Sequence, residues 1–280
     1  MFVRVIPRLD IKGPNLVKGI HLEGLRVLGK PEQYAKYYYE GGADELLFMD
    51  VVASLYGRNS LHGIISKTAR EIFIPLTVGG GIRSIEDIKS ILRSGADKVS
   101  INTAAVKNPR LINQAAQIFG SSTIVVAIEA IKQDDGNYYA FTDNGREKTG
   151  IEVVTWAKKV ESLGAGEIIL TSVDKEGTGQ GFDLELTKKV AEAISIPVVA
   201  HGGAGKLDDI KDAVVLGEAS AVSIASMFHY AALAKNKIDT QLDEGSSKFI
   251  TSGGSYAKVD KADIKQVKQH LLKNGVQCRI

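Results

Sequence analysis

Short runs of aliphatic and β-branched residues alternate with longer amphipathic stretches along most of the chain. Near-continuous apolar runs predict strands buried on both faces, and apolar residues recurring every three to four positions predict helices. Eight strands are predicted, over residues 3–10, 45–50, 74–78, 98–102, 123–129, 167–172, 197–200 and 221–225. A helix is predicted after each strand, over residues 32–40, 60–72, 84–94, 108–119, 151–163, 183–194, 207–216 and 261–273. This alternation is typical of α/β folds with a parallel sheet.

Eight strand–helix units favour a closed (βα)₈ TIM barrel, because closure buries every strand and leaves no edge. The alternative is an open, doubly wound sheet. It is less favoured because the G-x-G-x-x-G dinucleotide fingerprint is absent after the first strand. A chain of 280 residues is compatible with one barrel. We therefore predict a single barrel domain over residues 1–280.

The two halves of the chain repeat each other. Residues 75–89 resemble residues 197–211, and residues 42–45 resemble residues 164–167, both 122 positions apart. Residues 99–103 and 222–226 match at nearly the same offset. Matches in the same order at a constant offset indicate a duplicated (βα)₄ half-barrel, with halves at about 1–120 and 121–280.

Two segments fall outside the repeating pattern. Residues 132–149 contain an Asp-Gly and an Asn-Gly pair, which predict a β-hairpin inserted after the fifth strand. Residues 237–256 are rich in Ser, Gly and Asp and follow the eighth strand. We expect this insertion to extend from the carboxyl-terminal face of the barrel as a loop.

Composition narrows the class of partner. Hydrophobic residues make up 44% of the chain, and the formal net charge is only +2 with both signs dispersed. This charge pattern does not indicate a basic surface that would bind nucleic acid or membrane, so we expect the binding partner to be a small molecule or another protein. The single cysteine, Cys278, and the lack of a basic-then-apolar leader favour a cytoplasmic protein. The five histidines show no metal-ligand spacing, so neither a metal nor a cofactor is expected.

Glycine-rich turns follow the third and seventh predicted strands, at Gly79-Gly80-Gly81 and Gly202-Gly203. Glycines before a helix let backbone N–H groups converge on an anion. Each turn is also explicable as a tight connection without a ligand. The neighbouring strands four and eight end in further donors, at Asn102, Thr103, Ala225 and Ser226. The duplication therefore predicts two phosphate sites across one mouth, and a substrate with a phosphate at each end.

Two carboxylates end the first and fifth strands, at Asp10 and Glu129. Strands one and five face each other across an eight-stranded barrel, so these side chains would flank a substrate that spans both phosphate sites. We interpret them as a catalytic acid/base pair. The alternative is that each carboxylate pairs with Lys12 or Lys18. Additional substrate contacts are predicted near the ends of strands two and six, at Asp50, Thr171 and Asp174.

Four charged residues stand at the starts of strands one, two, four and six, at Arg4, Glu45, Lys98 and Glu167. They belong to the amino-terminal face of the barrel, opposite the predicted chemistry. Features of that face usually concern stability, so an ion-paired plug is the default interpretation.

The sequence resembles the cyclase subunit family of imidazole glycerol phosphate synthase over residues 4–230 and 261–279. The most specific motifs lie at residues 4–10, 42–46, 79–83, 98–102, 164–168 and 202–205. The resemblance implies a (βα)₈ barrel that receives ammonia from a glutaminase docked at its amino-terminal face. Ammonia then converts a bisphosphorylated formimino-aminoimidazole carboxamide ribulotide into imidazole glycerol phosphate and aminoimidazole carboxamide ribotide, in histidine biosynthesis.

The resemblance also implies roles for individual residues. Asp10 corresponds to the family's acid/base, and Gly177 joins the second phosphate site. The quartet of Arg4, Glu45, Lys98 and Glu167 resembles the family's gate to an ammonia channel. The chain departs from the family pattern at three positions and in the 237–256 insertion: Glu129 and Glu176 replace aspartates, and His201 replaces a small residue.

Three other functions share this type of barrel. Cyclase-like barrels also occur as partners of amidotransferases that convert an acetamido group on a nucleotide-linked sugar into an acetamidino group for surface polysaccharide, and this chain is similar to that group as well. A barrel without activity could bind a phosphorylated metabolite only. The isomerase of the preceding histidine step shares the duplicated barrel, but it needs no ammonia gate.

Overall fold

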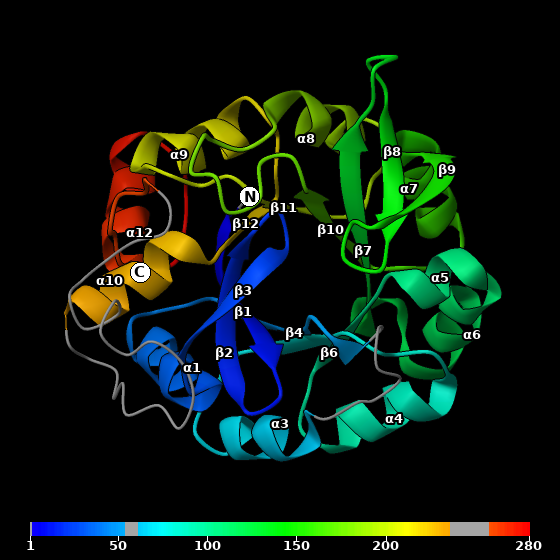
Figure 1. Ribbon diagram of the computed structural model, residues 1–280, viewed down its shortest axis with the longest axis horizontal. Coiled ribbons are helices and arrows are strands. Elements are labelled where there is room, and N and C mark those ends of the chain that lie inside the picture. Colours follow the sequence, from blue (N-terminus) through cyan, green and yellow to red (C-terminus); the bar gives the residue numbers. More distant parts are fainter. Residues whose placement is uncertain (1, 54–60, 236–257) are drawn as a thin grey trace.

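The computed structural model describes residues 2–53, 61–235 and 258–280. Within these residues, eight parallel strands form a closed ring in which each strand pairs with the next and the last pairs with the first (Figure 1). In ring order they are β1 (Arg4–Lys12), β4 (Leu46–Asp50), β5 (Leu76–Gly79), β6 (Lys98–Ile101), β7 (Ile124–Lys132), β10 (Glu167–Ser172), β11 (Val198–His201) and β12 (Ala221–Ile224). The predicted TIM barrel is confirmed, and the open sheet is wrong.

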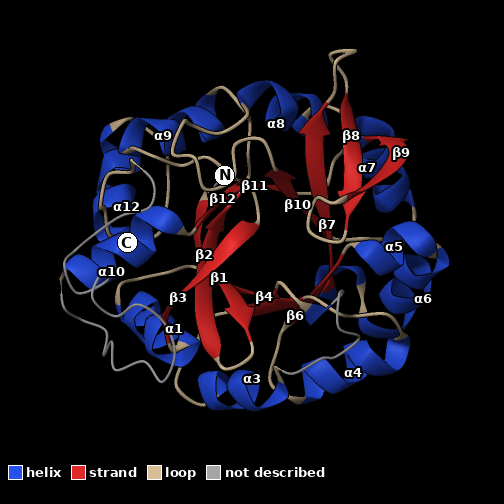
Figure 2. Ribbon diagram, viewed as in Figure 1, coloured by secondary structure: helices blue, strands red, loops and turns tan. Residues whose placement is uncertain are grey.

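Helices surround the ring of strands (Figure 2). Those that match the predicted helices are α1 (Pro31–Glu40), α3 (His62–Ala69), α4 (Ile85–Arg93), α6 (Arg110–Phe119), α7 (Val153–Ser162), α8 (Leu184–Ala191), α9 (Leu207–Val215) and α12 (Ile264–Lys273). Two further helices follow strands directly and were not predicted: α5 (Thr103–Lys107) and α10 (Ser226–Ala234). The helix α5 has five residues, which form about one and a half helical turns. The second is buried from Ser226 to Leu233, so it lacks the polar face that marks a surface helix.

Two of the barrel strands continue into antiparallel hairpins. The strands β8 (Tyr138–Thr142) and β9 (Glu147–Glu152) extend β7, which confirms the predicted hairpin. The strands β2 (Asn15–Ile20) and β3 (Glu23–Gly29) extend β1 in the same way and were not predicted. The turn of this second hairpin places His21 and Leu22 at positive φ, where glycine or asparagine is usual. The turn therefore has no signal in the sequence.

The elements of the two halves correspond one to one. Each half consists of a barrel strand with a hairpin, three further barrel strands, and the helices between them, and it ends with a short helix and a longer one. Gly80 and Gly202 show how close the correspondence is, with φ of 99° and 96°. A Cβ at either position would lie within 2.6 Å of the carbonyl oxygen that ends the adjacent strand, Asp50 or Ser172. Each turn therefore requires glycine for backbone reasons, with or without a bound anion.

The barrel interior is divided into layers because alternate residues of each strand point inward. A central apolar layer consists of Ile6, Leu47, Val125, Ala127, Ile169, Val199 and Ala221. A much larger apolar cluster lies between the strands and the surrounding helices. The central layer separates the charged residues at the amino-terminal face from those at the mouth.

The predicted 237–256 insertion and residue 60 of the predicted 60–72 helix lie outside the described residues. Cys278 is buried and pairs with Val3 in an isolated parallel bridge. In the described part of the chain, no helix has the length and apolar character needed to cross a membrane.

A difference between the two halves gives a stability prediction. Ser84 caps α4 by accepting a hydrogen bond from the Asp87 backbone, and Lys206 caps α9 with the same backbone angles to within 1°. A lysine side chain has no acceptor to offer. Lys206→Ser should therefore raise the free energy of unfolding by about 1 kcal/mol, measured by urea denaturation. Ser84→Ala is the matched control and should lower it by a similar amount; an unchanged Lys206→Ser stability beside a destabilised Ser84→Ala would contradict the prediction.

Candidate active site

A cavity of about 270 Å³ opens at the carboxyl ends of β4 to β7. Its lining includes Asp50 and the predicted first phosphate site: Gly80, Gly81, Asn102 and Thr103. Glu129 also lines it, so the carboxylate and the phosphate site share one space. We call this space the first cavity.

The turn between β8 and β9 contributes Asp143 and Asn144 to the first cavity. The Asp143 backbone N–H donates to Thr103 Oγ1 over 3.2 Å, and Asn102 Nδ2 donates to the Phe141 carbonyl over 3.3 Å. The hairpin therefore contacts Asn102 and Thr103, the two side chains of the predicted first phosphate site. Two cations that we did not predict, Arg83 and Lys107, also line this cavity.

The predicted second phosphate site surrounds a much smaller space of about 20 Å³, which we call the second cavity. Its lining includes all five predicted residues: Gly177, Gly202, Gly203, Ala225 and Ser226. Ser226 is the first residue of α10, so the N-terminus of this helix faces the site. Lys18, Glu176, His201 and Ser223 complete the wall. The duplicated turns thus form two cavities of unequal size.

Asp10 is buried on β1 and pairs with Arg8, whose Nε lies 2.8 Å from Asp10 Oδ1. Burial alone would raise the pKa of Asp10, but the charges of Arg8 and Lys18 outweigh it and hold the pKa below the ordinary value. Asp10 is therefore ionised at neutral pH. The alternative pairings with Lys12 or Lys18 are not the ones observed, because Lys18 pairs with Glu176.

Glu129 is buried on β7, across the ring from β1 (Figure 1). Its Oε2 accepts a hydrogen bond from the Gly145 backbone over 2.8 Å. Burial raises the pKa of Glu129 to about 7, although the Gly145 amide and the Arg8 charge act in the opposite direction. Opposed carboxylates with separated pKa values are the usual arrangement for an acid and a base in one site.

The remaining predicted contacts lie outside the two cavities. Thr171 is buried on β10 beside Glu129, with which it is in register. Asp174 is exposed, and its carboxylate accepts a hydrogen bond from the Lys132 backbone over 2.9 Å. That contact connects the loop after β10 to the end of β7.

The predicted quartet is assembled at the opposite face of the barrel. Glu45 accepts hydrogen bonds from Arg4 Nη1 over 2.9 Å and from Lys98 Nζ over 3.0 Å. Glu167 also pairs with both cations, with Lys98 Nζ at 3.1 Å. The two carboxylates are nearly buried, whereas the side chains of Arg4 and Lys98 retain 27% and 20% exposure. The cations therefore close the barrel on the side that faces solvent.

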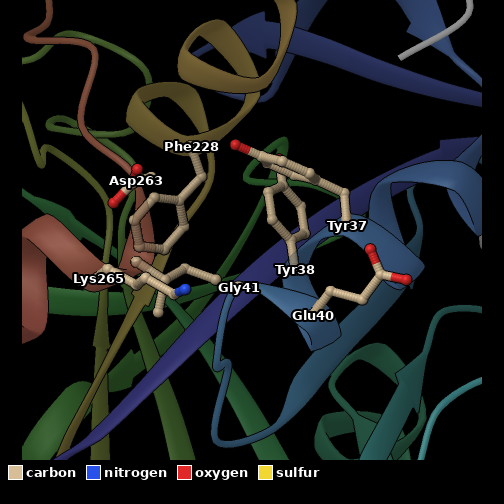
Figure 3. Close-up of a pocket in the computed structure, with 8 residues that line it drawn as sticks. Tyr37, Tyr38, Glu40, Gly41, Phe228, Asp263 and Lys265 are labelled. Atoms are coloured by element: carbon tan, nitrogen blue, oxygen red, sulfur yellow. The ribbon is translucent and has the colours of Figure 1, made fainter. Parts of the chain in front are cut away.

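A cavity of similar volume to the first lies outside the barrel, between α1, α10 and α12 (Figure 3). Tyr37, Tyr38 and Phe228 form its apolar wall, and Asp263 lies at its edge. None of the predicted site residues lines it. We therefore place the active site in the mouth of the barrel.

Comparison with known proteins agrees with this architecture. A family model described as "Histidine biosynthesis protein" matches residues 4–234. The "Imidazole glycerol phosphate synthase subunit HisF" of Legionella pneumophila is 61% identical over 207 residues, which are 74% of this chain and 98% of that protein. The chain belongs to the HisF family.

Two further HisF proteins, with lower identity to this chain, give the same result. The subunit from Alkaliphilus metalliredigens is 48% identical over 241 residues, 86% of this chain and 96% of that protein. The subunit from Methanocaldococcus jannaschii is 49% identical over 246 residues, 81% of this chain and 90% of that protein. All three relatives carry the synthase name, so the acetamidino-forming alternative is not favoured.

The raised pKa of Glu129 predicts a cost to the folding of this HisF-family chain. The folded protein retains the Glu129 proton up to about pH 7, whereas the unfolded chain releases it near pH 4.5, so the cost develops between these values. Glu129→Gln removes the ionisation. The free energy of unfolding should then increase by up to about 3 kcal/mol at pH 8, with no such gain at pH 4.5. Glu147→Gln on exposed β9 is the control; an equal gain at both pH values in Glu129→Gln would contradict the prediction.

Proposed function

We propose that the chain is the cyclase subunit of imidazole glycerol phosphate synthase. It would use ammonia from a glutaminase partner to convert a bisphosphorylated formimino-aminoimidazole carboxamide ribulotide into imidazole glycerol phosphate and aminoimidazole carboxamide ribotide. The observation that carries this proposal is the arrangement of two phosphate-type cavities with Asp10 and Glu129 on opposite strands of the same mouth. Family membership supplies the reaction.

The two cavities suit a substrate with separated phosphates. The first lies beside the glycine turn after β5, and the second lies beside the glycine turn after β11, so each half of the duplicated barrel contributes the glycine turn of one cavity. A nucleotide-linked sugar carries its two phosphates side by side, so a single cavity would take both. This difference favours the ribulotide over the sugar nucleotide.

Asp10 and Glu129 differ in protonation state, and this difference favours a different chemical role for each carboxylate. Asp10, held ionised by Arg8, would accept protons as ammonia nitrogen forms its new bonds to carbon. Glu129, with a pKa of about 7, would donate a proton to the amino nitrogen of the departing aminoimidazole carboxamide ribotide as its bond to the formimino carbon breaks. Asp50 and Thr171 remain candidate substrate contacts, and Asp174 would act through its loop.

We assign the glutaminase to the amino-terminal face of the barrel. Three large exposed hydrophobic residues lie at this end, because Phe2 precedes β1, Phe73 precedes β5 and Leu216 follows α9. Phe73 is 81% exposed and Phe2 is 63% exposed. Exposed aromatic side chains at one face of a protein are typical of protein–protein interfaces. Glutamine and phosphorylated metabolites are both intracellular, so the proposal includes a cytoplasmic location.

The quartet would serve as the ammonia gate between this interface and the mouth. Ammonia is neutral, so it can cross the apolar layer of Ile6, Val125 and Val199, whereas an ammonium ion would pay a large desolvation cost there. The exposed side of the gate consists of Arg4 and Lys98. Movement of either cation would open a path into the barrel.

Asp10→Asn tests the chemical assignment. The variant should fold and bind the bisphosphorylated ribulotide, because the amide has nearly the same shape as the carboxylate. Turnover with ammonium salts should fall at least about 100-fold, the usual contribution of a general acid or base. Wild-type turnover should require added ammonia. Near wild-type turnover in Asp10→Asn would remove Asp10 from the mechanism, and turnover of a nucleotide-linked acetamido sugar instead of the ribulotide would overturn the cyclase assignment.

Lys98→Met tests the gate. The substitution keeps the length of the side chain and removes the charge that bridges Glu45 and Glu167. The ratio of glutamine-dependent to ammonia-dependent turnover, measured with the glutaminase present, should change at least about tenfold, because added ammonia can reach the open mouth directly. Lys107→Met at the mouth is the matched control and should leave that ratio unchanged. Equal effects of Lys98→Met on both reactions would favour a structural plug.

A further inference from the structure

His201 occupies an unusual position in the wall of the second cavity. It ends β11, is only 5% exposed, and takes the place of the small residue expected there from the family pattern. Its Nδ1 lies 2.9 Å from the Ser223 carbonyl oxygen on β12. A carbonyl oxygen can only accept a hydrogen bond, so Nδ1 carries the proton. In the neutral ring, Nε2 then presents a lone pair.

Nε2 of His201 is buried and has no hydrogen-bonding partner among the described residues. The Ser223 hydroxyl, in the same cavity wall, is buried and unpartnered as well. Two such groups in one cavity indicate that a polar ligand atom belongs between them. The cavity volume of about 20 Å³ accommodates one water-sized group, such as a single phosphate oxygen.

The side-chain charges around His201 form two ion pairs and sum to zero. Arg8 and Asp10, on β1, pair with each other, and Lys18, on β2, pairs with Glu176 from the loop after β10. The wall contributed by β12 is the uncharged Ser223. Burial and the Arg8 charge lower the pKa of His201 to about 3, so the ligand-free ring is neutral. The side chains around the second cavity therefore carry no net positive charge to balance a phosphate dianion.

We propose that His201 makes phosphate binding in the second cavity proton-coupled, with one proton shared between a phosphate oxygen and Nε2. A phosphate monoester has its second pKa near 6, so it is mostly a dianion at pH 8. A dianion oxygen and the Nε2 lone pair are both acceptors and would repel each other. One proton taken from solvent converts this repulsion into a hydrogen bond, while the Ser223 hydroxyl donates a second one. This inference rests on the proposed function for the identity of the ligand.

The proton coupling has a direct consequence for affinity. Because the bound form carries one more proton than the free dianion, binding should weaken about tenfold for each pH unit above 6 and level off below it. His201→Ser removes the lone pair, and His201→Asn can supply amide donors in its place. Both variants should bind the dianion without this steep pH dependence.

The test is calorimetry with the bisphosphorylated ribulotide in the absence of ammonia, in pairs of buffers that differ in ionisation enthalpy. At pH 8 the wild type should take up about one proton more than His201→Ser or His201→Asn, and the difference should vanish at pH 5. Asn102→Ala in the first cavity is the matched control: it should weaken binding and leave the proton uptake intact. Nitrogen-15 spectra of the wild-type histidines give an independent readout, since Nε2 of His201 should change from an unprotonated to a hydrogen-bonded signal on binding.

The outcomes separate this inference from the proposed function. Binding and turnover by the wild type with the same proton uptake as both His201 variants would overturn proton coupling and leave the cyclase assignment in place. An unchanged Nε2 signal on binding would do the same, because it would mean that a water molecule satisfies the ring. Failure of the wild type to bind the bisphosphate would overturn both.

Discussion

Closure of the parallel barrel is the constraint on which the rest of the molecule depends. Once β12 pairs with β1, alternate residues of all eight strands must share one narrow interior and stack in layers. Charges are then tolerable only at the two ends, where solvent or a partner ion is available. The ion-paired quartet and the Asp10 to Glu129 mouth are these two ends, and the layer that contains Ile6 and Val199 keeps them apart.

The two halves of the barrel have the same arrangement of elements but differ in the electrostatic environment of their site residues. Gly80 and Gly202 have nearly identical conformations, yet the cavities beside them differ more than tenfold in volume. On the equivalent strands β1 and β7 of the two halves, Asp10 is held ionised beside Arg8, whereas burial raises the pKa of Glu129 to about 7. Symmetry of the fold thus supplies two equivalent positions, and local charge assigns them different roles.

Much of the fold and of the candidate site follows from the sequence, because strand periodicity and glycine turns are local signals. All eight barrel strands could be located in this way, and the residues predicted for the two phosphate sites, apart from Gly177, which came from the family resemblance, lie together in two cavities. Long-range partners could not be located from the sequence. The tautomer of His201 and the closeness of Lys18 to Glu176 depend on how separate strands and loops come together. The pairing of Asp10 with Arg8 is local, between alternate residues of β1, and was missed because only Lys12 and Lys18 were considered as partners. The β2–β3 hairpin was missed because His21 and Leu22 occupy a turn that usually requires glycine or asparagine.

For the proposed reaction, one substrate molecule must span the mouth from the first cavity to the second. The most direct test is a crystal structure of the protein with the bisphosphorylated ribulotide, in the absence of ammonia so that no turnover occurs. We expect one phosphate beside Gly81 and Thr103, the other beside Gly203 and Ser226, and the formimino group in the middle of the substrate between Asp10 and Glu129. Both phosphates in the first cavity, or a second cavity that remains closed, would contradict this account.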